Sequence, residues 1–327
     1  MLVPMLSASM CALILVLPAP AQNEPTTAEP PVRKVLVLGV DGMRGDALTR
    51  AETPHLDRLV AEGSFRTDAT NAWTAENAWN GHSATNWGVL LTGVSPARTD
   101  LCANGDGEHG IRDDEEGPAA FPTLFGHVKR HDAELETAVF YTWAGIGIGD
   151  AAPLARSASV LDHDFCPESG PSSAERDVAT IDAVVQCLAG RSPYAGADPD
   201  VVFVHLSQLD SAGHAHSYGS PEYGAAVGRV DALIGRLLAA IAARPRRDRE
   251  AWLILLSADH GGPEDSKGHG DNSLAAVHTV PFLLWADGLE RVELERPSLY
   301  DITPTALAWL GIDPEPLELD GRSLLPR

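Results

Sequence analysis

Short apolar runs alternate with stretches of helical periodicity along most of the chain. The runs have the length and the branched residues of buried strands. They are Val35–Val40, Ala138–Tyr141, Val201–Leu206, Trp252–Leu256 and Phe282–Trp285. Continuous apolar character is typical of parallel strands that are covered on both faces. The pattern therefore predicts an α/β fold with a mostly parallel central sheet and helices on both faces.

Three segments carry the signals of helices. The clearest helix begins at Pro221, with Ser220 as its cap. Its apolar positions form one stripe at helical spacing, comprising Val227, Val230, Ile234, Leu237, Leu238 and Ile241. Thr53–Leu59 opens a second helix, and Thr303–Leu310 forms a third. The stripe predicts a structural packing role for the first of these helices.

The first residues of the chain, 1–21, have the pattern of a secretory signal peptide. Leu13–Leu17 form a short apolar stretch, and Ala19-Pro20-Ala21 offers a small-x-small cleavage site. The apolar run is shorter than the roughly 20 residues that cross a bilayer, so no integral membrane span is expected. Residues 22–32 are rich in Pro, Glu and Thr and predict a linker. Residues 33–327 are expected to form one domain of an exported protein, periplasmic or secreted.

The chain is strongly acidic, with a formal net charge of −22 at pH 7. Such a surface argues against a stable nucleic-acid complex, because phosphate backbones bind Lys and Arg. It is compatible with a small phosphorylated substrate, since a metal centre can supply a local positive field. In an oxidising compartment Cys166 and Cys187 are predicted to pair, which leaves Cys102 free. No feature of the sequence specifies an oligomeric state.

Asp and His residues follow three of the predicted strands. They are Asp41 after the first run, Asp210 and His214 after the third, Asp259 and His260 after the fourth, and His269 in a Gly-rich loop just beyond. The carboxyl ends of parallel strands are where an α/β protein places its chemistry. Carboxylate oxygens and imidazole nitrogens suit zinc or a similar divalent ion. Ser83 adds a hydroxyl group as a candidate nucleophile.

Each of these signals is weak alone, since a single Asp at a strand end is often a structural residue or a helix cap. Their order and spacing give them weight. The motifs are Ser83 nine residues before Thr92-Gly93, Asp210-x-x-x-His214, Asp259-His260-Gly261-Gly262 and Gly268-His269-Gly270. Flanking segments are Thr53-Pro54-His55-Leu56, Asp301-Ile302-Thr303-Pro304 and Asp320-Gly321-Arg322-Ser323-Leu324. Over nearly the whole mature chain the sequence resembles the alkaline phosphatase superfamily, and within it the type I phosphodiesterase / nucleotide pyrophosphatase family.

The resemblance implies a single alkaline-phosphatase-like catalytic domain that binds two divalent metal ions, usually zinc. One ion would be held by Asp210, His214 and His269, and the other by Asp41, Asp259 and His260 together with the Ser83 oxygen. Such a pair of ions can stabilise both the entering and the leaving oxygen of an in-line displacement at phosphorus. The chemistry of the donor atoms agrees with this division of the ligands.

The resemblance also implies that Ser83 is the nucleophile and is transiently phosphorylated. A nearby metal ion makes a hydroxyl a competent nucleophile at neutral pH because it lowers the pKa of that hydroxyl. Asn86, three residues on, matches an Asn of the family that donates to a phosphoryl oxygen. The family usually has Thr-x-Pro-Asn-His around the nucleophile, whereas this chain has Ser83-Ala84-Thr85-Asn86-Trp87. Serine is chemically equivalent, so the departure weakens the phosphodiesterase assignment and leaves the mechanism intact.

Two assignments have rivals within the same motifs. His278 is the alternative to His269 as the sixth protein ligand, because a His-Thr pair near the last strand occurs in other branches of the superfamily. Thr85 and Thr92 are rival nucleophiles to Ser83. Thr92 followed by Gly is typical of the end of a helix, and the spacing to it favours Ser83 over Thr85.

Other residues near the motifs have both a functional and a structural interpretation. His82 adjoins Ser83 and is a candidate acid or base, although metal ions would make that role unnecessary. His216 is a candidate ligand, and a solvent-facing loop histidine is the alternative. Trp73, Trp79 and Trp87 surround the nucleophile segment and either stack on a substrate ring or pack in the core.

The sequence favours an exported, metal-dependent phosphoric ester hydrolase of the phosphodiesterase / nucleotide pyrophosphatase type. Its expected substrate is a small phosphate ester or a nucleotide-like molecule, with the leaving group open. An alkaline phosphomonoesterase on the same site is the alternative, although His205 stands where a carboxylate of a third metal site would be sought. A sulfatase is disfavoured, since Thr85 and Trp87 replace the Pro and Arg of its oxidation motif. A phosphate mutase is disfavoured by the export signal, and a non-catalytic metal- or phosphate-binding protein by the complete ligand set.

Overall fold

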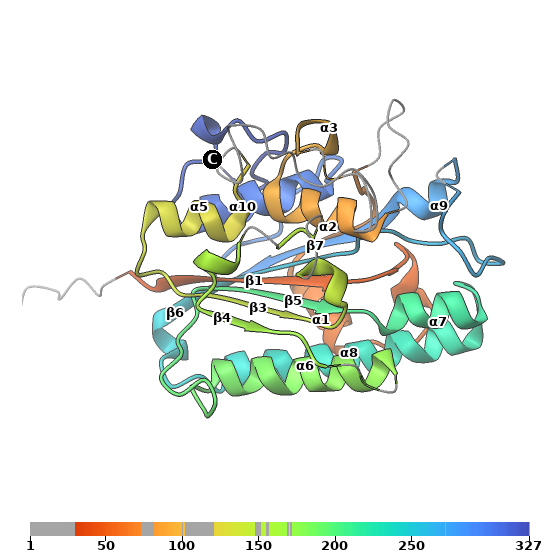
Figure 1. Ribbon diagram of the computed structural model, residues 1–327, viewed down its shortest axis with the longest axis horizontal. Coiled ribbons are helices and arrows are strands. Elements are labelled where there is room, and N and C mark those ends of the chain that lie inside the picture. The colour runs from red at the N-terminus through yellow and green to blue at the C-terminus, as the bar shows by residue number, and fades with distance from the viewer. Residues whose placement is uncertain are drawn as a thin grey trace, which may run out of the picture. The chain divides into compact units, whose positions relative to one another are not determined.

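The computed structural model describes residues 30–72, 82–99, 101, 121–147, 152–154, 157–168, 170, 172–271 and 273–326. The described fold belongs to one compact unit, Pro31–Arg327. Its centre is a seven-stranded sheet in the order β2-β7-β6-β1-β5-β3-β4 (Figure 1). The strands are β1 (Val32–Val40), β2 (Ser64–Thr70), β3 (Thr137–Tyr141), β4 (His163–Phe165), β5 (Val201–Leu206), β6 (Glu250–Ser257) and β7 (Thr279–Ala286).

The middle of the sheet is parallel. β1 pairs in parallel with both β5 and β6, and β3 pairs in parallel with β4 and β5. β7 is antiparallel to β6 and to the edge strand β2. The prediction of a mostly parallel sheet is confirmed. Because β1, β5 and β6 run side by side in one direction, their carboxyl ends reach the same edge of the sheet.

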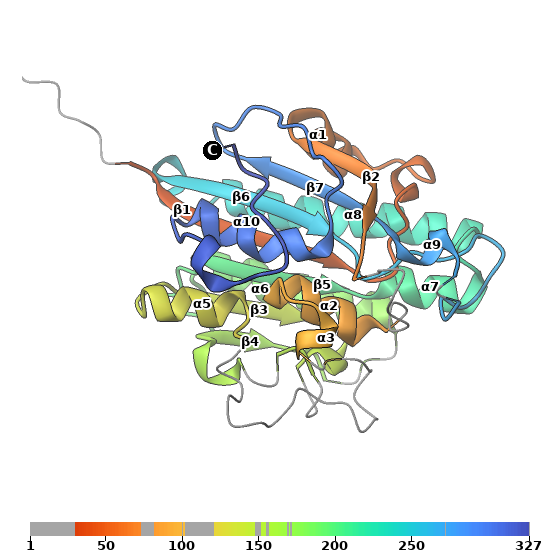
Figure 2. The ribbon, with the colours of Figure 1, turned by 90° about the horizontal axis from the view of Figure 1, so that it is seen from above.

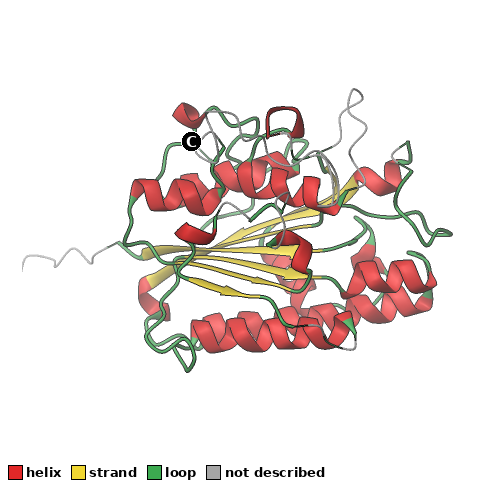
Figure 3. Cartoon of the chain, viewed as in Figure 1, coloured by secondary structure: helices red, strands yellow, loops and turns green. Residues whose placement is uncertain are grey.

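Helices cover both faces of the sheet (Figures 1 and 3). They are α1 (Pro54–Glu62), α2 (Ser83–Thr92), α3 (Pro96–Thr99), α5 (Leu124–His131), α6 (Ser173–Leu188), α7 (Gln208–His216), α8 (Pro221–Ala242), α9 (Ala275–His278) and α10 (Ile302–Trp309). α6, α7 and α8 lie below the sheet in the view of Figure 1, and α2, α5 and α10 lie above it. Figure 2 shows α10 lying across β1 and β6. The fold is therefore an α/β sandwich in which the sheet lies between two layers of helices.

The apolar runs form the interior of this sandwich. All positions from Val35 to Val40 are buried, as are all positions of β5 and β6. Trp87 of α2 is 0% exposed and lies against β1 at Gly39, where an added Cβ would come within 2.6 Å of the indole ring. Trp87 is consequently a core residue and not a platform for a substrate ring. Trp73 and Trp79 lie outside the described residues.

The predicted helices are present with small shifts in their ends. α8 begins at Pro221, and the Ser220 side chain accepts a hydrogen bond from the Tyr223 backbone N–H. All positions of its predicted stripe are buried except Leu238, which is partly buried. α1 and α10 occupy the other two predicted segments.

Two strands and one disulfide were not predicted correctly. The polar edge strands β2 and β4 lack an apolar run, and most of their side chains are only partly covered by the rest of the fold. The predicted Cys166–Cys187 disulfide is wrong, because both thiols are free. Cys187 is fully buried in α6, and Cys166 is half-buried after β4. Cys102 lies outside the described residues.

The amino-terminal predictions lie largely beyond the described part of the chain. The signal peptide, residues 1–21, is outside it, as is the predicted linker up to residue 29. β1 begins at Val32, which was assigned to the end of that linker. Within the described residues, no helix has the length and apolar character needed to cross a membrane.

Candidate active site

Backbone hydrogen bonds join the three segments that follow β1, β5 and β6. The Asp41 N–H donates to the carbonyl of Leu206 at 2.9 Å, and the Asp210 N–H donates to the carbonyl of Asp41 at 3.1 Å. The Gly42 N–H donates to Asp259 Oδ1 at 3.2 Å. The parallel register thus brings together the carboxylates that are far apart in the sequence.

The first group of candidate ligands comprises Asp41, Asp259 and His260. One donor atom from each lies within 4.8 Å of the others. His260 Nε2 lies 3.5 Å from Asp41 Oδ1 and 3.4 Å from Asp259 Oδ2. Asp41 is 4% exposed, and the other two residues are 0% exposed. This group is therefore enclosed by protein on nearly all sides.

The second group comprises Asp210, His214 and His269, whose donor atoms also lie within 4.8 Å of one another. His214 Nε2 and His269 Nε2 lie 3.5 Å and 3.8 Å from Asp210 Oδ1. The structure places His269, and not His278, in this group. The His269 ring stacks on His260 of the first group with centroids 3.6 Å apart. The two groups are thus immediate neighbours.

Backbone carbonyls orient two of the imidazole rings. His260 Nδ1 lies 2.8 Å from the carbonyl of Gly261, and His214 Nδ1 lies 2.7 Å from the carbonyl of Lys267. A carbonyl oxygen can only accept, so each Nδ1 carries the proton and each Nε2 presents a lone pair. Both lone pairs face carboxylate oxygens. In each group, a cation between the Nε2 atom and the carboxylate oxygens could bind both kinds of atom. Histidine metal sites are commonly built in this way, with the second ring nitrogen held by a carbonyl.

The electrostatics of the first group point in the same direction. Burial, followed by the nearby charges of Asp259 and Asp210, raises the pKa of Asp41 well above its usual range. Burial also raises the pKa of Asp259. Among the described residues, Asp41 Oδ1, Asp259 Oδ2 and His260 Nε2 have no hydrogen-bond partner. Buried oxygen and nitrogen donors in this state fit a divalent cation; their assignment as ligands stays a prediction.

Ser83 lies beside the first group at the start of α2. His82 is the N-cap, Ser83 is the first helical residue, and Gly93 ends the helix in the left-handed conformation with φ of 69°. Ser83 is 8% exposed, and its side chain interacts with Asp259, which offsets part of the rise that burial causes in the pKa of that carboxyl. The positive end of a helix favours negative charge on a group at this position. The geometry is therefore suitable for a nucleophile that attacks a phosphate ester.

Three other polar residues of α2 are occupied or buried. Asn86 is 0% exposed, and its Oδ1 accepts from the Ala72 N–H at 3.0 Å. This contact ties α2 to the end of β2, and the proposed donation by Asn86 to a phosphoryl oxygen stays a prediction. Thr92 donates to the carbonyl of Gly88 at 2.7 Å, at the end of the helix remote from the ligand groups. Thr85 is 1% exposed and makes no side-chain hydrogen bond within the described structure.

The structure adds residues that support the carboxylates. The Tyr218 hydroxyl donates to Asp210 Oδ1 at 2.5 Å, and His205 Nε2 lies 3.2 Å from Asp41 Oδ2. Asp177 of α6 accepts from the N–H groups of Ser207 and Gln208 at 2.9 and 3.0 Å, which fixes the start of α7. An ionisable residue inside an apolar strand is a sequence signal for His205. Tyr218 and Asp177 carry no comparable signal.

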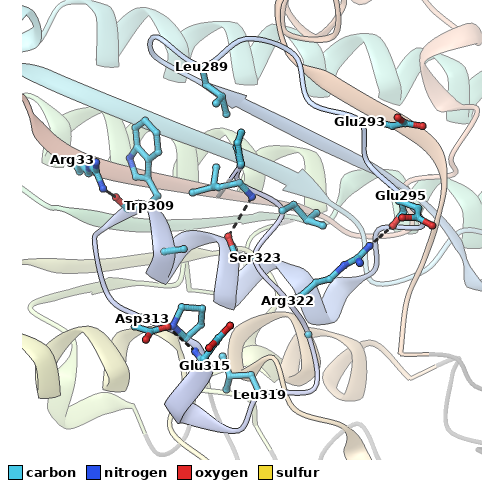
Figure 4. Close-up of a pocket in the computed structure, with 16 residues that line it drawn as sticks. Arg33, Leu289, Glu293, Glu295, Trp309, Asp313, Glu315, Leu319, Arg322 and Ser323 are labelled. Carbon is cyan, nitrogen blue, oxygen red and sulfur yellow. Dashed lines mark hydrogen bonds between the residues drawn. The ribbon is translucent and has the colours of Figure 1, made fainter.

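A large cavity lies at the other end of the molecule (Figure 4). Its volume is about 1120 Å³, and its lining includes Arg33 at the start of β1 and Trp309 at the end of α10. The Arg33 guanidinium donates to the carbonyl of Trp309, and that of Arg322 donates to the carbonyl of Glu295. None of the predicted site residues lines this cavity. The candidate active site is therefore assigned by its chemistry and not by the size of a hollow.

Comparison with known proteins gives similarities in sequence and in fold. The chain is 30% identical over 223 residues to a 2,3-bisphosphoglycerate-independent phosphoglycerate mutase of Halobacterium salinarum, covering 64% of this chain and 41% of the mutase. The chain thus spans less than half the length of that relative. The fold matches a murine ectonucleotide pyrophosphatase / phosphodiesterase 5, solved with AMP bound, at a TM-score of 0.60 and 14% identity, over 90% of this chain and 96% of the murine chain. It also matches a 2-O GAG sulfatase at a TM-score of 0.65 and 16% identity, over 90% of this chain and 73% of the sulfatase.

The family comparison covers the candidate active site. Residues 35–280 match the family described as type I phosphodiesterase / nucleotide pyrophosphatase. This interval contains both ligand groups and Ser83. The chain belongs to the type I phosphodiesterase / nucleotide pyrophosphatase family.

Proposed function

We propose that this protein is an exported, metal-dependent phosphoric ester hydrolase of the phosphodiesterase / nucleotide pyrophosphatase type. The observation that carries the proposal is the arrangement of two three-residue ligand groups beside a serine at a helix N-terminus. Membership of the family supports hydrolysis of a phosphate ester. The fold alone, which sulfatases share, does not distinguish among ester classes.

The ligand groups fit two divalent ions, with zinc as the expected metal. Asp41, Asp259 and His260 would hold one ion beside Ser83, and Asp210, His214 and His269 would hold the other. When bound, the ions supply a positive field that favours loss of the Ser83 proton and stabilises charge on the phosphoryl oxygens. The two His N–H···O=C bonds would hold His214 and His260 so that their Nε2 atoms are available as ligands.

The chain's own residues account for the covalent steps. Ser83 Oγ loses its proton and forms a bond to phosphorus, while the bond from phosphorus to the ester oxygen breaks and the leaving group takes up a proton. Water then attacks the phosphoserine, the Ser83 O–P bond breaks, and the hydroxyl is restored. Asn86 is proposed to donate to a phosphoryl oxygen during both steps.

Charge balance favours an anionic substrate despite the acidic surface. Asp41, Asp210 and Asp259 contribute three negative charges, whereas two divalent ions contribute four positive ones. The loaded site is therefore net positive before Ser83 loses its proton, within a chain of net charge −22. A small phosphate ester or nucleotide-like molecule can enter such a site. A long nucleic acid would also be repelled by the acidic protein surface around the site, so no stable nucleic-acid complex is proposed.

The test is a substrate panel with the purified full-length protein, with and without zinc. We expect zinc-dependent hydrolysis of a bis-aryl phosphate diester to exceed that of the matching aryl monoester and aryl sulfate. Ser83→Ala should abolish hydrolysis and the burst of leaving group. Thr85→Val is the matched control, because it replaces a buried hydroxyl of the same helix that has no hydrogen-bond partner in the described structure.

Each outcome of the panel decides between functions. Dominant monoester cleavage would move the enzyme to the alkaline phosphomonoesterase alternative with the same site. Interconversion of phosphoglycerates, assayed in parallel, would favour the activity of the mutase relatives. Bound zinc without turnover of any of these substrates would refute the proposed hydrolase.

Export is proposed from residues 1–21 and is tested separately. We expect the full chain to accumulate outside the cytoplasm when cells are fractionated, and a chain without residues 1–21 to remain inside. Equal distribution of the two chains would contradict the proposal.

A further inference from the structure

His205 is a buried imidazole that the proposed chemistry does not use. It lies in β5, opposite Gly39 of β1 and Tyr141 of β3. Its side chain is 0% exposed, and every other residue of β5 is apolar. Burial of a polar ring in such a strand costs free energy unless the ring gains a hydrogen bond. The partner of His205 is therefore informative.

That partner is Asp41. His205 Nε2 lies 3.2 Å from Asp41 Oδ2. The Trp87 ring packs against the imidazole at 87° with centroids 5.0 Å apart. The Thr142 hydroxyl donates to the His205 carbonyl at 3.1 Å and holds the backbone. These contacts leave the ring little freedom to turn away from Asp41.

The geometry determines which atom donates. As a metal ligand Asp41 would be ionised, and a carboxylate oxygen only accepts, so His205 Nε2 would carry the proton of the ring. His205 Nδ1 is buried and has no hydrogen-bond partner in the part of the chain that the structure describes. A buried Nδ1 without an acceptor fits a neutral ring that has a single N–H.

Because of this contact, the two carboxylate oxygens of Asp41 have different neighbours. Oδ2 faces His205, and Oδ1 lies 3.5 Å from His260 Nε2, on the side of the first ligand group. The terminal torsion of an Asp side chain has a broad, roughly two-fold preference. Within the described structure His205 supplies the hydrogen bond to Oδ2, so its loss would leave this torsion less restrained.

Resting on the proposed function, we propose that His205 is a positioning residue whose Nε2–H fixes Asp41 so that Oδ1 faces the metal site formed with Asp259 and His260. The neutral ring adds no charge to the site. The hydrogen bond of the His205 ring joins it to Asp41, a residue of the first ligand group. Loss of its N–H therefore weakens the binding of one ion and spares the other.

The experiment compares three variants of the full-length chain. His205→Gln places an amide N–H near the position of Nε2, His205→Asn places one nearer to Nδ1, and His205→Leu removes the donor. Each protein is stripped of metal with a chelator and titrated calorimetrically with zinc in the presence of a competing chelator. Circular dichroism of each stripped protein shows whether it is folded.

We expect the wild-type chain and His205→Gln to bind two zinc ions with similar affinities. His205→Leu and His205→Asn should bind one of the two ions about 10- to 100-fold more weakly, as typical for loss of a group that orients a ligand. Saturating zinc should restore hydrolysis in both, because all proposed ligands remain. If His205→Leu does not fold, the comparison of Asn with Gln makes the same test.

Two results would overturn the proposal. One is wild-type zinc affinity at both sites in a folded Leu or Asn variant, since His205 would then only pack. The other is an equal loss of affinity in the Gln variant. A wild-type chain that binds no zinc would refute the proposed function itself and is thereby distinguished from either result.

Discussion

Tyr218 offers a single-atom perturbation of the second ligand group. Its hydroxyl donates to Asp210 Oδ1 at 2.5 Å, and the residue is 0% exposed. The ring fills the space left by Gly213 and Gly262, where an added Cβ would lie within 2.5 and 2.3 Å of ring atoms. Tyr218→Phe keeps this ring packing and removes only the donor. Its effect should therefore be specific to Asp210.

The size of the effect follows from the kind of hydrogen bond that is lost. Burial and the charge of Asp210 raise the pKa of Tyr218, so the hydroxyl remains protonated and donates. A hydrogen bond to a charged group contributes about 1.5–3 kcal/mol. Since each 1.4 kcal/mol is a factor of about ten in affinity, the ion held by Asp210, His214 and His269 should bind about 10- to 100-fold more weakly.

The assay is zinc titration of the stripped protein against a competing chelator, with thermal unfolding measured in parallel. Tyr194→Phe is the matched control, because Tyr194 packs on Phe140 and His163, away from both ligand groups. Wild-type affinity at both sites in Tyr218→Phe would refute the reasoning, as would an equal loss in Tyr194→Phe. A fall in thermal stability without a change in zinc affinity would assign Tyr218 to packing alone.

Three further predictions concern pH and buried charge. The pKa values of Asp41 and Asp259 are raised in the folded protein, so their contribution to stability is full below the unfolded value of about 3.9 and is lost as pH rises through the folded pKa. The metal-free protein should therefore lose stability as the pH is increased from acid values. The increase in Tm on adding zinc should become larger over the same pH range, and an increase in Tm that does not depend on pH would contradict this. Asp177→Ala leaves the N–H groups of Ser207 and Gln208 without their acceptor and should lower the free energy of unfolding by about 2–5 kcal/mol in urea; a change within error would be contrary to expectation. Lys34→Met removes the buried cation that pairs with Asp198 and Asp200; because Asp198 keeps its ion pairs with two arginines, the cost in the same assay should be about 1.5–3 kcal/mol, with the exposed Arg58→Met as control.

The sequence predicted the parts of the site that depend on strand ends. Asp41, Asp210 and Asp259 each follow an apolar run, and parallel pairing of three adjacent strands necessarily brings their carboxyl ends together. The division of the histidines came from the resemblance, and the structure brings His269 beside Asp210 and His214. Their roles as ligands, like that of Ser83 as nucleophile, are still predictions.

The supporting residues could not be predicted because their positions depend on chain turns and on distant packing. Tyr218 follows α7 after Ser217, whose φ of 99° turns the chain back toward the site. Asp177 reaches the start of α7 from a helix that precedes it by a whole strand. β2 and β4 were missed because an edge strand needs no continuous apolar run. The Cys166–Cys187 disulfide was predicted only from the expected oxidising compartment and the number of cysteines. Neither of these determines where a thiol lies within the fold.

The site is electrostatically unfavourable in the protein alone, and this accounts for its composition. Three carboxylates meet within a few ångströms, and burial raises the pKa of two of them. The apolar interior of β1, β5 and β6 and the hydrogen bonds that join their ends hold the backbone of these residues in place. Repulsion that movement cannot relieve is relieved by protons, which the raised pKa values allow these carboxyls to keep, and it returns as pH rises. A divalent ion that replaces these protons would remove the same repulsion and add its own coordination energy. Neutral donors such as His205 and Tyr218 can orient the carboxylates without cancelling the charge that attracts the ions, whereas a Lys or Arg in either place would compete with the metal.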